Sequence, residues 1–263
     1  MSETIAQSVV PNKPKLYGHS QTKNMQGCMT TIEADFPLEK QATKITGVHP
    51  IDILTLQPEE RKHLLEGFNT SIIADSNIVI RKAVPLRALT ASCTKVHDLF
   101  QVRPKATQFR VYGKVNQKSI EKLLDIFTTE KLVDTKDIKL VVPDMSFVDG
   151  VLLYQACLAL GIVYHHTKPL LNFLCAQVTA HDLSPEEMST IVNRCPPQDP
   201  LFRHLANKLC HRRFKKQIKD VAFEHWLAKK PTLQKAMSDI DQAHEKRRTA
   251  INERKCTWSS GNI

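Results

Sequence analysis

The sequence predicts an α+β fold, in which a small sheet of three to five strands packs against a helical cluster and an all-helical C-terminal extension follows. Three β-branched runs, at residues 76–82, 109–115 and 138–144, have the composition of short strands. Helical patterns alternate irregularly with these runs, and after residue 144 only helical periodicity remains. The strands are few and short, which favours a small α+β domain with a helical extension.

The chain has 263 residues, of which 41% are hydrophobic and only 6% aromatic, so its core must be mostly aliphatic. Composition and pattern predict five segments along it. They are a mostly disordered segment over 1–45, a lead-in helix and linker over 46–75, the α+β domain over 76–180, a basic helical extension over 181–255, and a disordered tail over 256–263.

The first predicted helix begins where Gln57 precedes Pro58 at the first helical position, and its buried face carries Leu64, Leu65 and Phe68. The strand at 76–82 follows. A helix over residues 83–100 is predicted next, because five apolar residues recur at steps of three and four. These residues are Leu86, Leu89, Cys93, Val96 and Phe100.

The segment over residues 115–134 predicts a short amphipathic helix with no catalytic feature. Asn116 can cap it, and Thr128 and Thr129 end it. Its apolar residues lie at i, i+3, i+4 and i+7, which places them on one face: Ile120, Leu123, Leu124 and Phe127. We expect this face to fill the core.

Two helices are predicted after the third strand. The first covers residues 146–163, with Gly161 in a left-handed turn at its end, and the second covers 167–180, with Pro169 near its start.

The C-terminal extension contains the clearest helix start in the chain. Ser184 followed by Pro185 and by Glu187 forms a capping box. The next helix carries Leu201, Leu205 and Leu209 on one face. Asp220 is the expected cap of a helix over 221–230, and a last helix over 231–255 is expected to extend into solvent.

The order of these elements resembles a divergent BTB/POZ domain over roughly residues 76–180. Residues 115–132, "VNQKSIEKLLDIFTTEKL", are similar to the family pattern "v.p.aFe.lLdfiYTg.l", with Ile120 at the usual Phe position. Residues 146–162 resemble the later "n..eLl.aAd.L.i" helix, and Cys175 takes the Cys position of the helix after it. The C-terminal part is similar to the tails of uncharacterised fungal BTB-like proteins.

This resemblance implies a non-catalytic protein-protein interaction protein. The family forms homodimers or binds partners such as a cullin scaffold, through an apolar helix face or a strand edge that another chain covers. By family analogy, helix 83–100 and the stretch before it are the expected dimer or partner surface. The side chains expected there are Leu86, Leu89, Val96 and Phe100.

A second hypothesis assigns nucleic-acid or acidic-partner binding to the C-terminal helices. The net charge of +10 is concentrated between Arg203 and Lys255, where 15 Lys/Arg stand against 6 Asp/Glu. The expected contacts are Arg212, Arg213, Lys215, Lys216 and Lys219. The competing interpretation, which the sequence favours, makes Phe214, Phe223 and Trp226 core residues of the extension and the lysines its solvated face.

Catalytic, cofactor and metal sites are not expected. His165-His166 and Cys210-His211 lack the spaced pairs of structural zinc sites, and adjacent side chains on a helix usually point in different directions. Asp182, Glu186 and Glu187 are explained by helix capping rather than by acid/base chemistry.

Cysteine usage and the lengths of the apolar segments indicate where the protein is located. Seven cysteines without a CxxC pair are typical of reduced thiols. The longest near-apolar run, over 151–163, is too short to span a bilayer, and the N-terminus lacks the apolar stretch of a secretory signal. We therefore expect an intracellular protein, cytoplasmic or nuclear, with no membrane partner.

Overall fold

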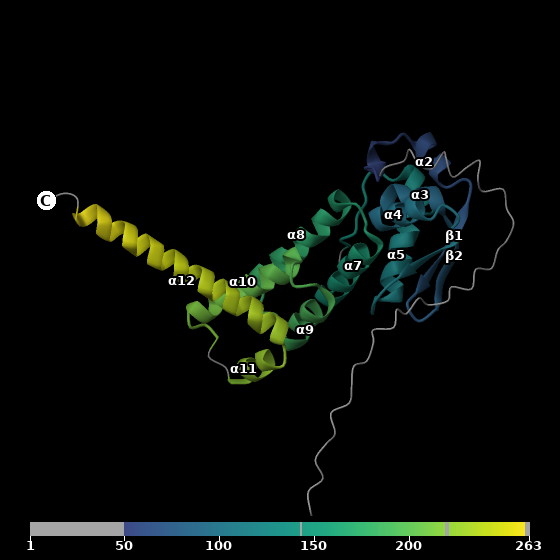
Figure 1. Cartoon of the computed structure of the whole chain (residues 1–263). Coiled ribbons are helices and arrows are strands. Elements are labelled where there is room, and N and C mark those ends of the chain that lie inside the picture. The colour runs from purple at the N-terminus through teal and green to yellow at the C-terminus, as the bar shows by residue number, and fades with distance from the viewer. Residues whose placement is uncertain (1–49, 143, 219–220, 261–263) are drawn as a thin grey trace, which may run out of the picture. The chain divides into compact units, whose positions relative to one another are not determined.

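The computed structural model describes residues 50–142, 144–218 and 221–260, and the side chains up to residue 251. The expectations for residues 1–45 and 261–263 lie outside this range. The described elements, labelled in Figure 1, are η1 (Ile53–Thr55), α2 (Pro58–Leu64), β1 (Asn69–Ala74), β2 (Val79–Pro85), α3 (Leu86–Ser92), α4 (Thr94–Val102), β3 (Gln108–Val111), α5 (Gln117–Phe127), α6 (Lys131–Asp134), α7 (Phe147–Leu160), α8 (Tyr164–Ala180), α9 (Pro185–Arg194), α10 (Pro200–Phe214), α11 (Val221–Ala228) and α12 (Pro231–Ser260).

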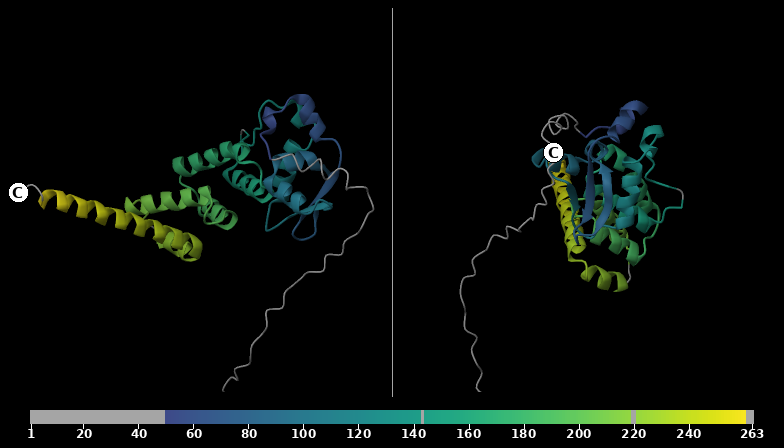
Figure 2. Two further views of the ribbon diagram at one scale, coloured as in Figure 1. Left: turned by 45° about the horizontal axis from the view of Figure 1, so that its top comes forward. Right: turned by 90° about the vertical axis from the view of Figure 1, so that its right-hand side faces the viewer.

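The fold is α+β, with a three-stranded mixed sheet in the order β2-β1-β3. β1 pairs antiparallel with β2 and parallel with β3. A tight loop joins β1 to β2, in which Asn77 adopts a φ of 61° and the Ala74 N–H donates to the Ile78 carbonyl at 2.8 Å. The views in Figure 2 show the helices gathered against one side of this sheet.

The strand predictions are right in number but partly wrong in position. Residues 138–142, expected as a strand, have no sheet partner among the described residues, and the third strand is instead β1. Ile138 and Leu140 are nevertheless buried, so their β-branched and aliphatic character reflects packing of an extended segment. The expected domain boundary at residue 76 therefore falls within the β1–β2 hairpin.

The segment before β1 belongs to the same packed unit. Ile53 is fully buried, and Arg61 of α2 is buried with its guanidinium donating to backbone carbonyls. Its Nε reaches the Leu56 carbonyl at 3.0 Å, and its Nη1 contacts carbonyls of α6 and the loop after it. A buried guanidinium is stable only when its donors are satisfied. Because the carbonyls of α6 accept some of these hydrogen bonds, Arg61 stabilises the packing of α2 against α6.

The single helix expected over residues 83–100 is interrupted. Cys93 is extended, with φ −127° and ψ 109°, and separates α3 from α4. It forms an isolated antiparallel bridge with Ile162, and the next residue, Thr94, donates its N–H to the Gly161 carbonyl at 2.7 Å. This pairing with the turn after α7 outweighs the local helical periodicity.

The helix α5 confirms the prediction for residues 115–134. The Asn116 side chain accepts the Ser119 N–H at 3.0 Å, and the helix ends at Thr128, whose hydroxyl donates to the Leu124 carbonyl. All four residues of the predicted apolar face are buried: Ile120, Leu123, Leu124 and Phe127.

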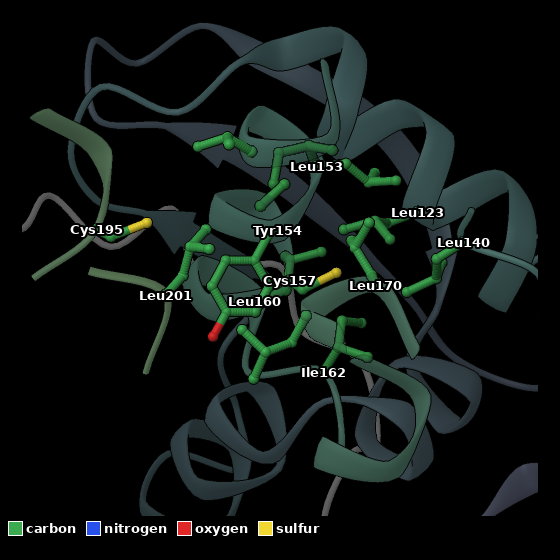
Figure 3. Close-up of a cluster of buried hydrophobic side chains, with 14 of the residues drawn as sticks. Leu123, Leu140, Leu153, Tyr154, Cys157, Leu160, Ile162, Leu170, Cys195 and Leu201 are labelled. Atoms are coloured by element: carbon green, nitrogen blue, oxygen red, sulfur yellow. The ribbon is translucent and has the colours of Figure 1, made fainter. Parts of the chain in front are cut away.

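The core lies where α5, α7 and α8 meet, and Figure 3 shows side chains from these helices converging there. α7 is buried on most of its surface, and Gly161 ends it with the predicted left-handed φ of 73°. α8 begins at Tyr164, so Pro169 lies in its second turn.

The extension is helical, as expected. The capping box of α9 is present, since Ser184 and Glu187 exchange side-chain to backbone hydrogen bonds. α12 continues to Ser260, past residue 255, so most of the expected disordered tail is helical. Asp220, the expected cap of α11, lies outside the described residues. Among those described, no helix combines the length and apolar content needed to cross a bilayer.

A buried hydrogen bond joins α7 to the start of α10. The Tyr154 hydroxyl donates to Asp199 Oδ2 at 3.0 Å, while Asp199 Oδ1 caps α10 by accepting the Leu201 N–H. We expect Tyr154→Phe to destabilise the protein by about 1.5–3 kcal/mol, because a buried carboxylate would lose a donor. Urea unfolding measures this loss, and an unchanged midpoint would contradict it.

Candidate functional site

The residues expected to form the partner surface lie in the core. Leu86, Leu89, Val96 and Phe100 are each at most 5% exposed within a single chain. A second chain cannot contact these side chains unless α3 and α4 first separate from the rest of the fold. The apolar stripe over residues 86–100 is therefore a packing face, and the expectation of a docking face there is corrected.

Of the basic residues expected to bind nucleic acid, the two arginines on α10 are in ion pairs within the chain. Arg212 pairs with Asp182 at 2.9 Å, and Arg213 pairs with Asp241 of α12. Lys215 and Lys216 are exposed, and Lys219 lies outside the described residues. Arg212 thus joins α10 to the loop before α9, and Arg213 joins α10 to α12, so two of the five expected contact residues are engaged within the chain.

The aromatic residues of the extension divide into two groups. Phe223 and Trp226 are half-buried, their ring centroids 5.7 Å apart, and Trp226 Nε1 donates to Ser189 Oγ at 3.0 Å. These two belong to the packing of the extension, as expected. Phe214, expected in the core, is instead exposed, and the Arg248 guanidinium lies 4.9 Å from its ring centroid.

A surface at one end of the sheet exposes large apolar side chains. Ile78 is 55% exposed, Val79 43% and Tyr112 73%. These three residues, with the half-buried Ile80 and Val115, are called the sheet-end patch here. They belong to the β1–β2 loop, the start of β2 and the segment after β3.

A hollow of about 570 Å³ lies beside the patch. Its lining includes Ile78, Ile80, Val111 and Val115, together with polar residues such as Asp75 and Lys114. An apolar centre with a polar rim is the composition of protein-protein contact surfaces. β2 and β3 are also the edge strands of the sheet, which gives the same region backbone groups for pairing.

A second group of polar side chains, Asp52, His165 and His166, lies where the start of η1 meets the first turn of α8. His165 Nε2 lies 3.2 Å from His166 Nε2 and 3.2 Å from Asp52 Oδ1, and His166 Nε2 lies 3.7 Å from the same oxygen. The expectation that adjacent histidines point apart is therefore wrong here. At a helix start no preceding turn restricts the rotamers, so the two rings can converge.

The three groups differ in exposure. The His166 side chain is 2% exposed, whereas His165 and Asp52 are 41% and 38% exposed. Burial, with a smaller effect of His165, lowers the pKa of His166 to about 4. At neutral pH the His166 imidazole is therefore neutral and able to offer a lone pair.

The described thiols are poorly suited to nucleophilic catalysis. Burial raises the pKa of Cys93, Cys157 and Cys195, and it raises the pKa of Cys210 to about 12. A thiol that stays protonated at neutral pH is a weak nucleophile. These cysteines act as small apolar residues of the core, as the sequence indicated.

Sequence reasoning missed the sheet-end patch and Asp52. The sequence pattern places Ile78 and Tyr112 in strands, and only their places at strand ends distinguish them from core residues. Asp52 had a detectable signal, because an Asp before Ile53-Leu54 is a typical helix cap, but its approach to α8 is a tertiary contact. Comparison of the chain with protein-family models, curated proteins and solved structures gives no match.

Proposed function

We propose that the chain is a non-catalytic protein-protein interaction protein built on a BTB/POZ-like domain, which binds its partner through the sheet-end patch. The order β2, α3–α4, β3, α5, α7 and α8 supports this, since it is the order that the family resemblance implies. One element differs: the family has a strand before the α7-like helix, where residues 138–142 here are extended without a sheet partner.

The observation that carries the proposal is the exposure of Ile78, Val79 and Tyr112 at one end of the sheet, where Ile78 also lines the hollow. Large apolar side chains gathered in this way lose contact with water when another chain covers them. Of the two physical routes to association, an apolar helix face and a strand edge, the first has less support, because the apolar face shared by α3 and α4 is buried within the chain. The sheet end remains.

The partner proposed first is a second copy of this chain. A twofold contact places the same patch on both sides, so that Ile78 and Tyr112 of each copy enter the contact. Backbone groups on the free edge of β2 can then pair across the axis. The cullin scaffold, implied by the family resemblance, is the proposed partner for an adaptor role.

Sedimentation velocity over a series of protein concentrations tests the self-association. We expect a reversible dimer, and we expect Ile78→Glu to weaken it about tenfold or more because a carboxylate would be buried in the contact. Val102→Glu is the matched control, since Val102 is 79% exposed at the end of α4, outside the patch. It should leave the dimer unchanged.

Two results would count against this proposal. A monomer at every concentration contradicts self-association, and an equal effect of Ile78→Glu and Val102→Glu contradicts the patch. Binding of a purified cullin scaffold by the wild type, lost in Ile78→Glu, supports the adaptor role. The alternative, nucleic-acid or acidic-partner binding through the basic C-terminal helices, has less support, because Arg212 and Arg213 are in ion pairs within the chain while Lys215 and Lys216 remain exposed.

A further inference from the structure

The cluster of Asp52, His165 and His166 has a geometry that hydrogen bonds explain poorly. Each Nε2 carries at most one hydrogen when its imidazole is neutral. If His165 Nε2–H donates to Asp52 Oδ1, the same hydrogen must also serve the lone pair of His166 Nε2 at 3.2 Å. If His166 donates to His165 instead, the lone pair of His165 faces a carboxylate oxygen. One metal ion would satisfy all three atoms.

The spacing of the three atoms suits a tetrahedral ion. Ligands about 2.0–2.1 Å from Zn²⁺ lie about 3.3–3.4 Å apart at tetrahedral angles, and about 2.9 Å apart at right angles. The distances here are 3.2, 3.2 and 3.7 Å. They lie closer to the edges of a tetrahedron than to those of an octahedron, and the chemistry of two imidazoles and one carboxylate is that of a zinc site with three protein ligands.

The surrounding structure holds the ligands in place. The Leu54 N–H donates to Asp52 Oδ1 at 3.0 Å, which fixes the carboxylate at the start of η1. The Phe127 ring packs against His166, with the centroids 5.5 Å apart, which confines the buried imidazole. The positive end of the α8 dipole disfavours a cation at this place, and the negative charge of Asp52 offsets it.

We propose that Asp52, His165 and His166 bind a divalent transition-metal ion of the zinc class. The partial exposure of His165 and Asp52 leaves the fourth corner of the tetrahedron to a water molecule. The bound ion connects the segment around η1 to the first turn of α8, so it stabilises the folded state in which the two segments meet. This inference does not depend on the sheet-end patch or on its partner.

Titration of the full, reduced and metal-free chain with Co²⁺ tests the proposal. We expect the visible absorption bands of tetrahedral Co²⁺ without the intense near-ultraviolet band of thiolate ligation, and we expect Zn²⁺ to displace the signal. Asp52→Asn retains the cap of η1, because Asn also accepts the Leu54 N–H. That variant and His165→Gln should each weaken binding about tenfold or more.

His225→Gln is the control, because His225 is an exposed histidine on α11. It should bind Co²⁺ as the wild type does. Zn²⁺ should raise the melting temperature of the wild type, and it should raise that of His225→Gln by the same amount. Three results would overturn the proposal: no spectrum in the wild type, a thiolate spectrum, or full binding by Asp52→Asn and His165→Gln. Circular dichroism of each variant shows that a lost signal does not come from unfolding.

Discussion

Phe127→Ala is expected to lower the free energy of unfolding by about 3–5 kcal/mol. The Phe127 side chain is 1% exposed and is among the largest fully buried side chains of the described residues. Its removal leaves a cavity between α5 and the start of α8, where the ring contacts His166. Helical segments on both sides restrict how far this space can close, so the loss should lie near the upper end of the range. Urea unfolding monitored by circular dichroism measures it.

Lys118→Ala is the control on the same helix. Lys118 is exposed on α5, away from the buried face, and its removal should change the unfolding free energy by less than about 0.5 kcal/mol. A loss below about 1 kcal/mol for Phe127→Ala, roughly a quarter of the expected effect, would mean that α5 is not a packing element. Equal losses of unfolding free energy in Phe127→Ala and Lys118→Ala would also contradict the packing role of α5.

Gly161→Ala is expected to cost about 2–4 kcal/mol, from backbone strain and crowding together. Gly161 has a φ of 73°, in the left-handed region that L-residues adopt at a cost. A Cβ there would lie 2.7 Å from Thr94 Oγ1 and 2.8 Å from the Lys95 backbone nitrogen. Because the Gly161 carbonyl also accepts the Thr94 N–H, the turn after α7 cannot shift without breaking its contact with α4.

Gly113→Ala separates the two contributions to this effect. Gly113 has a similar φ of 86°, but a Cβ there would meet no atom within 4 Å. It should therefore cost about 1 kcal/mol or less, from strain offset by the reduced entropy of the unfolded chain. Thermal unfolding of both variants measures the difference. Equal melting temperatures would contradict the close packing of Gly161 against α4.

The sequence predicted best those features that depend on neighbouring residues. The capping box at Ser184, the Asn116 cap and the left-handed Gly161 all appear as expected, because each is stabilised by atoms within one turn of the chain. The apolar face of α5 was equally predictable, since helical spacing alone places its four residues together.

Features set by distant contacts were not predictable from local pattern. The periodicity from Leu86 to Phe100 continues through Cys93, yet the bridge to Ile162 breaks the helix there. The β-branched run over 138–142 has strand composition but lacks a neighbouring strand among the described residues. Which apolar stripe is covered by the chain itself, and which is left for a partner, depends on such contacts.

The candidate sites show the same limit. The exposure of Ile78 and Tyr112 depends on where the sheet ends, and neighbouring residues of similar character, such as Ile72 and Val111, are buried. The histidines were visible as a pair, but Asp52 approaches them only after η1 packs beside α8. Spacing in the sequence therefore gave no indication of three converging ligand atoms.

Hydrogen–deuterium exchange of the full chain, at concentrations below and above the onset of self-association, tests most directly which surface meets the partner. We predict that amides of residues 75–80 and 111–115 gain protection at the higher concentration, while α3 and α5 remain protected at both. Protection gained only in α3 and α4, with the sheet end unchanged, would contradict the assignment of the partner surface to the sheet-end patch.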